Sequence, residues 1–109
     1  MAYNEGLAER VRELLAKRKG VTERKMFGGV AFMLNGNMMC GVRNEDLILR
    51  LDPEEGDAAL ERKHTRPFDL SPKPMRGMVM IAEQGCKRSA DLKQWIGKAA
   101  KFVEALPAK

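Results

Sequence analysis

The chain has few of the residues from which metal and disulfide sites are built. Among its 109 residues are two cysteines, Cys40 and Cys86, and one histidine, His64. Two cysteines outside a CxxC pair are too few for a disulfide scaffold, so we expect both to be reduced thiols. A structural zinc site takes about four ligands, and this chain cannot supply the usual cysteine and histidine sets. We therefore expect no metal and no cofactor.

Methionines close to Cys40 leave copper(I) binding as an alternative, because thioether and thiolate ligands suit that ion. Methionine also fills irregular cores, and a free cysteine on a strand behaves as a small apolar side chain. We favour this second interpretation for the methionines at positions 33, 38 and 39.

Long apolar runs are also missing. No stretch approaches the ~20 consecutive apolar residues that a membrane span needs, and the first residues have neither a basic nor an apolar signal region. We expect a cytoplasmic protein that does not enter a membrane. With 44% hydrophobic and 32% charged residues, the chain can bury a normal core, so residues 1–109 are predicted to form one domain.

The residues needed for nucleophilic catalysis do not stand in a recognisable arrangement. Such chemistry would require Cys40 or a serine beside His64, with a third group to orient the imidazole. Ser71 and Ser89 have turn and helix-cap contexts that explain them. We predict that the protein is not an enzyme. A polar pocket around Cys40 or His64 would support the enzyme alternative, which we place third.

Two other motifs have simpler structural explanations. The acids Glu54, Glu55 and Asp57 follow Asp52-Pro53, an arrangement typical of a helix start. The pair Gly28-Gly29 has neither dinucleotide-binding nor P-loop spacing and precedes a strand rather than a helix, so we interpret it as a turn or bulge.

Hydrophobic periodicity predicts the order α-β-β-β-β-α-β-α. We expect helices over residues 4–19, 53–63 and 89–106, strands over 23–27, 30–34, 38–42, 46–51 and 75–83, and an irregular segment over 64–74. Asn35-Gly36 predicts a tight hairpin. Short turns between strands favour an antiparallel sheet. The fold class is therefore α+β, with two layers and the helices on one face of a mainly antiparallel sheet.

Details of burial follow from the same reading. Arg50 interrupts the apolar strand 46–51, which we expect to be less completely buried than residues 30–34. Phe68 and Leu70 are expected to anchor the irregular segment, and Ser89 to cap the last helix.

The net charge of +5 is unevenly distributed. Residues 45–57 are acidic, whereas the first helix, residues 62–76 and the last helix are basic. Such an arrangement can attract an anionic partner, although solvated helix faces also produce it. We select Lys25, Arg76 and Lys93 as candidate contacts to a protein partner or, more weakly, to DNA. Aromatic residues make up only 6% of the chain and occupy apparent core positions, which speaks against a stacking platform for single strands.

The segment KMFGGVAFMLNGNM (residues 25–38), followed by Arg66-Pro67-Phe68 and Pro74-Met75-Arg76-Gly77, resembles the N-terminal domain of the TfoX/Sxy family. The resemblance implies a two-layer α+β fold similar to small secretion chaperones, and it supplies no catalytic residues. The matched positions look like fold determinants: Met26, Phe27, Gly28, Gly29, Asn35, Gly36, Asn37, Pro67, Phe68 and Gly77.

The best-known members of that family are bacterial competence regulators that act with the cAMP receptor protein and carry a second domain. The resemblance therefore implies a stand-alone domain that works as a non-enzymatic regulatory binding module, acting through protein contacts, as a monomer or homodimer. The alternative is a chaperone-like interaction protein that binds a partner segment.

Overall fold

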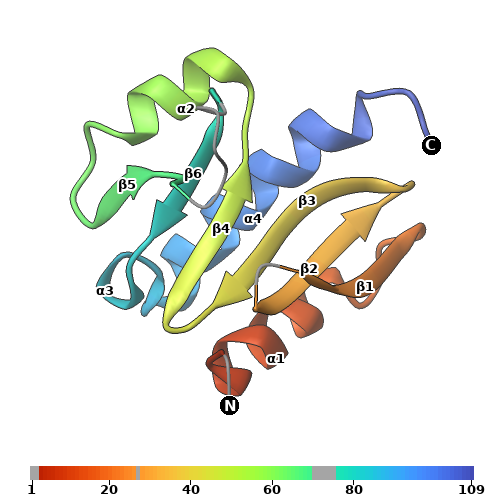
Figure 1. Cartoon of the computed structure of the whole chain (residues 1–109). Helices are drawn as coiled ribbons and strands as arrows, with labels where there is room; N and C mark the ends of the chain where they lie inside the picture. The colour runs from red at the N-terminus through yellow and green to blue at the C-terminus, as the bar shows by residue number, and fades with distance from the viewer. Residues whose placement is uncertain (1–2, 27, 70–75) are drawn as a thin grey trace.

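The computed structural model describes residues 3–26, 28–69 and 76–109. A six-stranded antiparallel sheet has the order β1-β2-β3-β4-β6-β5 (Figure 1). Its strands are β1 (Val21–Met26), β2 (Gly29–Leu34), β3 (Asn37–Arg43), β4 (Asp46–Arg50), β5 (Thr65–Pro67) and β6 (Met78–Ile81). The helices are α1 (Glu5–Leu15), α2 (Pro53–Ala59), α3 (Glu83–Cys86) and α4 (Ser89–Glu104). The predicted α+β class and element order are confirmed, and the structure adds β5 and α3.

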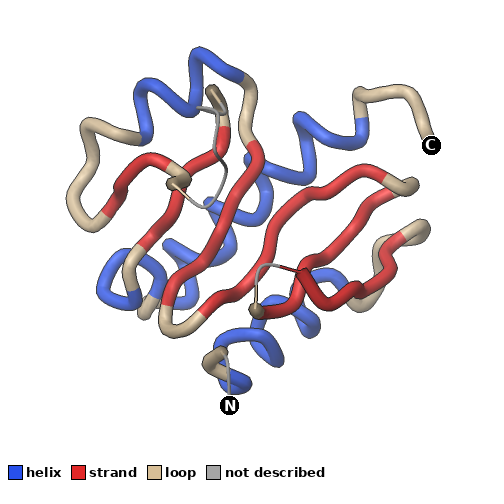
Figure 2. Tube along the Cα trace, in the orientation of Figure 1, coloured by secondary structure: helices blue, strands red, loops and turns tan. Residues whose placement is uncertain are grey.

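The main core lies between the sheet and the helices α1 and α4, which cover the same face (Figure 2). Val11 of α1, Phe32 of β2, Leu49 of β4 and Trp95 of α4 are all at most 2% exposed. Burial of each such side chain contributes roughly 1.5–3 kcal/mol. The Trp95 indole N–H donates to the carbonyl of Gly85 at 3.2 Å, so its one polar atom is satisfied.

A second, smaller cluster packs on the opposite face of the sheet. It contains Ile48, Phe68, Met78 and Met80, with Met38 packed against it. Phe68 therefore anchors the chain after β5 as predicted, and Leu70 lies outside the described residues. Strand 46–51 is less completely buried than β2, as expected, because Asp46 and Arg50 at the ends of β4 are half-buried whereas β2 is buried throughout. At its centre Ile48 is 2% exposed, because β4 has a strand on each side and side chains covering both faces.

The hairpin between β2 and β3 has the predicted tight turn. Asn35 and Gly36 have φ values of 53° and 84°, which suit an Asn-Gly pair. The turn also holds other segments of the chain. The Asn35 amide donates to Gly20, the Lys109 amide donates to the Asn35 carbonyl, and the Asn37 side chain donates to Pro107. Figure 1 shows the C-terminal segment beside this hairpin.

Both predicted helix starts in the first half are present. The Asn4 side chain accepts from the Leu7 amide at 3.0 Å, and Asp52 accepts from Glu54 at 2.9 Å. The helices end earlier than predicted, at Leu15 and at residue 59. At the second end, the Thr65 hydroxyl lies 2.7 Å from the carbonyl oxygens of residues 59 and 62 and can donate to either, which satisfies a terminal carbonyl.

The second half differs most from the sequence prediction. Residues 65–67 form an edge strand, where Pro67 is tolerated because an edge strand need not donate on both sides. Of the predicted strand 75–83, residue 75 lies outside the described residues, β6 covers Met78–Ile81, and Glu83 begins α3. Ser89 is the first residue of α4 rather than its cap. The cap position is Arg88, which makes no side-chain capping bond.

Candidate binding surfaces

The groups considered for catalysis lie in environments that do not activate them. Cys40 is fully buried within the main core, and desolvation raises the pKa of its thiol to about 12. Burial likewise raises the pKa of Cys86 to about 11. His64 is exposed. Both thiols are therefore protonated at neutral pH and poor nucleophiles. Within the described ranges, acids, cysteines and the histidine form no cluster of three or more that could hold a metal ion.

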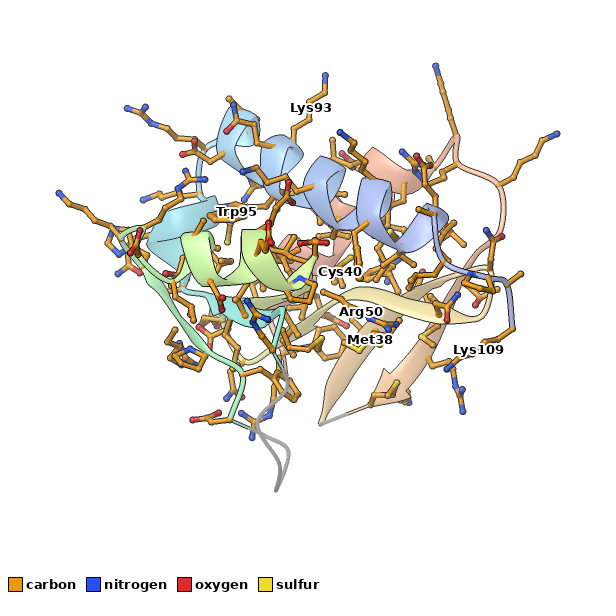
Figure 3. All side chains as sticks on the ribbon, turned by 90° about the horizontal axis from the view of Figure 1, so that it is seen from above. Met38, Cys40, Arg50, Lys93, Trp95 and Lys109 are labelled. Carbon is orange, nitrogen blue, oxygen red and sulfur yellow. The ribbon has the colours of Figure 1, made fainter. Side chains whose placement is uncertain are left out.

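The three candidate contact residues lie on separate parts of the surface. Lys25 is exposed on the edge strand β1. Arg76 lies in the turn before β6 and forms an ion pair with Asp57 of α2 at 2.7 Å. Lys93 projects from the outer side of α4, away from the sheet (Figure 3). The structure therefore does not combine these three residues into one site.

Lys93 belongs to a group of cations that we name the α4 basic face: Arg62, Lys93, Lys98 and Lys101. The three lysines are exposed on α4. The Arg62 guanidinium carbon lies 4.3 Å from the centre of the Trp95 ring, and the Lys98 ammonium lies 5.8 Å from it. These cation–π contacts hold Arg62 beside the helix. None of the four cations forms an ion pair with a residue that the structure describes.

A second surface is a hollow of about 270 Å³ between α2 and the strands β5 and β6, which we name the α2 groove. Asp57 and Arg76 stand at its rim as an ion pair. Leu60, at the edge of the groove, is 38% exposed. It and Leu14 are the two large apolar residues that are exposed in the described part of the chain. The apolar lining consists of Leu60, Pro67, Phe68, Met78 and Val79.

Backbone geometry accounts for the glycines of the recognised motifs. Gly28 and Gly77 have φ values of 76° and 92°, in the region that favours glycine. At Gly29, an added Cβ would lie 2.0 Å from the carbonyl oxygen of Val42 on the neighbouring strand. Met26 is half-buried at the end of β1, and Phe27 lies outside the described residues. Gly28 and Gly29 lie where the chain enters β2, whereas Gly77 lies in the turn before β6.

A family model of the TfoX N-terminal domain matches residues 13–103. The chain belongs to the TfoX N-terminal domain family. This is a family of non-catalytic domains. No curated protein and no solved structure matches the chain. Within the described part of this TfoX-type domain, no helix is both long and apolar enough to cross a bilayer.

Sequence reasoning missed two members of these surfaces. Helical spacing was sufficient to group Lys93 with the other lysines of α4. Arg62 joins them only because the fold carries the end of α2 to Trp95, and nothing local signals that contact. Leu60 is the second missed residue: it lies just after α2 and lines the α2 groove together with Pro67, Phe68 and Gly77. The sequence signal that could have found it is an apolar residue directly after a short acidic helix.

Proposed function

We propose that this TfoX-type domain is a non-catalytic regulatory binding module that acts through contacts with a protein partner. The observation that carries the proposal is the α2 groove, where Leu60 stays exposed beside an apolar lining. An exposed apolar residue beside such a groove offers a partner segment an apolar contact. In line with the known regulators of the family, the expected partner is a cytoplasmic protein of the transcription apparatus.

The charge around the groove specifies the chemistry of the partner. Four exposed acids lie on or just after α2, which itself contains no basic residue: Glu54, Glu55, Asp57 and Glu61. Of these four acids, Asp57 forms an ion pair with Arg76, which also interacts electrostatically with Glu54. The occupant that complements this surface is a segment with one apolar side chain, seated against Leu60, and flanking lysines or arginines.

The test uses the two exposed leucines as a matched pair. A photo-crosslinking amino acid is placed at position 60 or at position 14, and the captured proteins are identified from the source cells. The proposal expects one protein to crosslink from position 60 and not from position 14. A peptide that covers the basic segment of this partner, with its apolar side chain, should bind the wild type at least tenfold more tightly than it binds Leu60→Ser. It should bind Leu14→Ser as tightly as the wild type. Equal binding to Leu60→Ser would refute the proposal.

The same groove supports a second candidate function, a chaperone-like interaction protein. That function requires several unrelated unfolded segments to occupy the groove, rather than one folded partner. Light scattering of an aggregating client separates the two. If the wild type and Leu14→Ser suppress aggregation and Leu60→Ser does not, the result supports the chaperone-like function. If the wild type leaves aggregation unchanged, the result refutes that function.

A further inference from the structure

Helix α4 has a glycine where its own packing requires none. Gly97 is exposed in the middle of the helix, and an added Cβ would meet no atom within 4 Å. A glycine in a helix interior costs about 0.5–1 kcal/mol relative to alanine. No contact with a residue that the structure describes explains this glycine. A glycine does allow a ligand to approach the helix backbone closely from outside.

Lysines flank this glycine along the helix. Lys93, Gly97 and Lys101 are spaced at four-residue intervals, so they form one row on the surface of α4. With a rise of about 1.5 Å per residue, each lysine lies about 6 Å along the axis from Gly97. Lys98 lies about 100° round the helix from Gly97, and Arg62 lies beyond it against the Trp95 ring. Gly97 thus lies between Lys93 and Lys101, and Lys98 and Arg62 lie to one side of this row.

The rest of this helix surface lacks an anchor for a protein interface. Apart from the lysines, its exposed residues up to the last turn are Ser89, Ala90, Gln94 and Gly97. Protein interfaces concentrate their binding energy in buried aromatic and other apolar residues. Of the acids on α4, Glu104 is paired with Arg18 at 2.9 Å and Asp91 is half-buried. The surface therefore fits a polyanion better than it fits a protein.

Among the described residues, the α4 basic face has no exposed aromatic ring on which a base could stack, and this narrows the class of polyanion that it can bind. Trp95 is 2% exposed beneath the face, and Phe102 is half-buried against the core. Single strands are bound largely by stacking of bases on exposed aromatic rings. A duplex presents phosphates instead, about 3.4 Å apart along the axis for each strand. The separation of about 12 Å between Lys93 and Lys101 spans three to four of them.

We propose that the α4 basic face binds the phosphate backbone of double-stranded DNA without reading its sequence. Lys93 and Lys101 bind phosphates on either side of Gly97, where the DNA backbone comes closest to the helix. Lys98 and Arg62 bind the phosphates beside them. This surface is separate from the α2 groove, so either proposal can fail without the other.

The binding test uses the full chain and a fluorescent 20-base-pair duplex, measured by anisotropy. Neutralising three to four phosphates gives a slope of log affinity against log salt of about −2.7 to −3.6. We expect affinity to fall about 40- to 150-fold between 50 and 200 mM salt. The triple variant Lys93→Gln, Lys98→Gln, Lys101→Gln should bind at least tenfold more weakly, with a slope near −1.

The matched control removes the same charge elsewhere. Lys19→Gln, Arg24→Gln and Lys109→Gln change exposed residues after α1, on β1 and beyond α4, and together remove three positive charges. This variant should bind within about threefold of the wild type. Equal weakening in both triple variants would overturn the assignment to α4, as would absence of binding at 50 mM salt. Tighter binding of duplex RNA or polyglutamate would overturn DNA as the ligand.

The glycine provides an independent test. Gly97→Ala and Gly97→Gln leave every charge in place and put a side chain into open space. Both variants should fold at least as stably as the wild type, judged by Tm, and bind the duplex about three- to tenfold more weakly. Wild-type affinity in both variants would overturn the close approach at Gly97.

Discussion

At the scale of single residues, Gly29 is a position on β2 where the neighbouring strand leaves no room for a side chain. A Cβ there would lie 2.0 Å from the Val42 oxygen, and that oxygen belongs to the backbone of the central strand β3. We predict that Gly29→Ala lowers the free energy of unfolding by at least about 2 kcal/mol, because the strands must separate. Urea denaturation measures the loss. Gly97→Ala is the control and should raise stability by about 0.5–1 kcal/mol.

The buried thiol of Cys40 makes stability depend on alkaline pH. Its pKa is raised by desolvation from 9.0 to about 12 in the folded protein. Unfolding therefore releases a proton between these values, and the stability from the neutral thiol is complete below pH 9 and lost as pH rises toward 12. We predict that the wild type loses about 1.4 kcal/mol more than Cys40→Ala between pH 8 and pH 10.

Urea denaturation of both proteins at the two pH values provides the measurement. A thiol reagent added to the folded wild type at pH 8 should leave Cys40 unmodified until denaturant is added. Parallel pH dependences for the wild type and Cys40→Ala would contradict the prediction.

At the scale of elements, Arg12 connects α1 to the edge strand β1. Its guanidinium donates to both carboxylate oxygens of Glu23, at 2.7 and 2.8 Å. The hydrogen bonds from Arg12 lower the pKa of Glu23 below 4.5. The corresponding stability is present above pH 4.5 and lost as pH falls through the lowered value. Because both side chains are more than a third exposed, solvent screens the pair.

We predict that Arg12→Gln lowers the free energy of unfolding at pH 7 by less than about 1 kcal/mol. The difference from the wild type should shrink as pH falls through the Glu23 titration, and in 1 M salt. Thermal unfolding at pH 7 and pH 3 tests this dependence. A difference that grows at pH 3 would show that Arg12 acts through packing instead.

Local signals were sufficient to predict some elements and not others. Asn35-Gly36, Asn4 and Asp52 act through their own or neighbouring amides, so their turn and caps were legible in the sequence. Ser89 has the residue type of a cap, yet the chain enters α4 one residue earlier. Strand β5 could not be predicted because three residues with a proline become a strand only by pairing with β6.

The candidate surfaces divide in the same way. Lys93 could be selected from helical spacing, whereas the contact between Arg62 and Trp95 joins residues 33 positions apart. The surroundings of Arg76 and Lys25 also depend on tertiary structure. Arg76 forms an ion pair with Asp57, and Lys25 lies on the edge strand β1. Charge in the sequence therefore indicated which residues are exposed, but not which act together.

At the scale of the whole molecule, the two apolar clusters differ in size and predict two levels of stability. The larger cluster joins α1, α4 and the central strands, and the smaller one is centred on Ile48 and Phe68. We predict that amides of β2, β3 and β4 exchange with solvent only through global unfolding, while those of β5 exchange through local opening. Hydrogen exchange followed by NMR separates these classes.

Phe68→Ala should accelerate exchange in β5 and lower the overall free energy of unfolding by about 3–5 kcal/mol, because it removes the largest side chain of the smaller cluster. The conservative control is Phe68→Leu, which retains most of the volume. Equal free energies of exchange for β2 and β5 in the wild type would mean that the two clusters unfold as one unit.

Trp95 is the only tryptophan of the chain, and its ring lies against Arg62 and Lys98 of the α4 basic face. The unlabelled protein therefore carries one intrinsic fluorophore, with two cations close to its ring. Occupancy of the face should change emission intensity at a constant wavelength, because the indole stays buried while its charged neighbours move. Unfolding exposes the indole and shifts its emission to the red. One optical signal thus distinguishes a bound domain from an unfolded one.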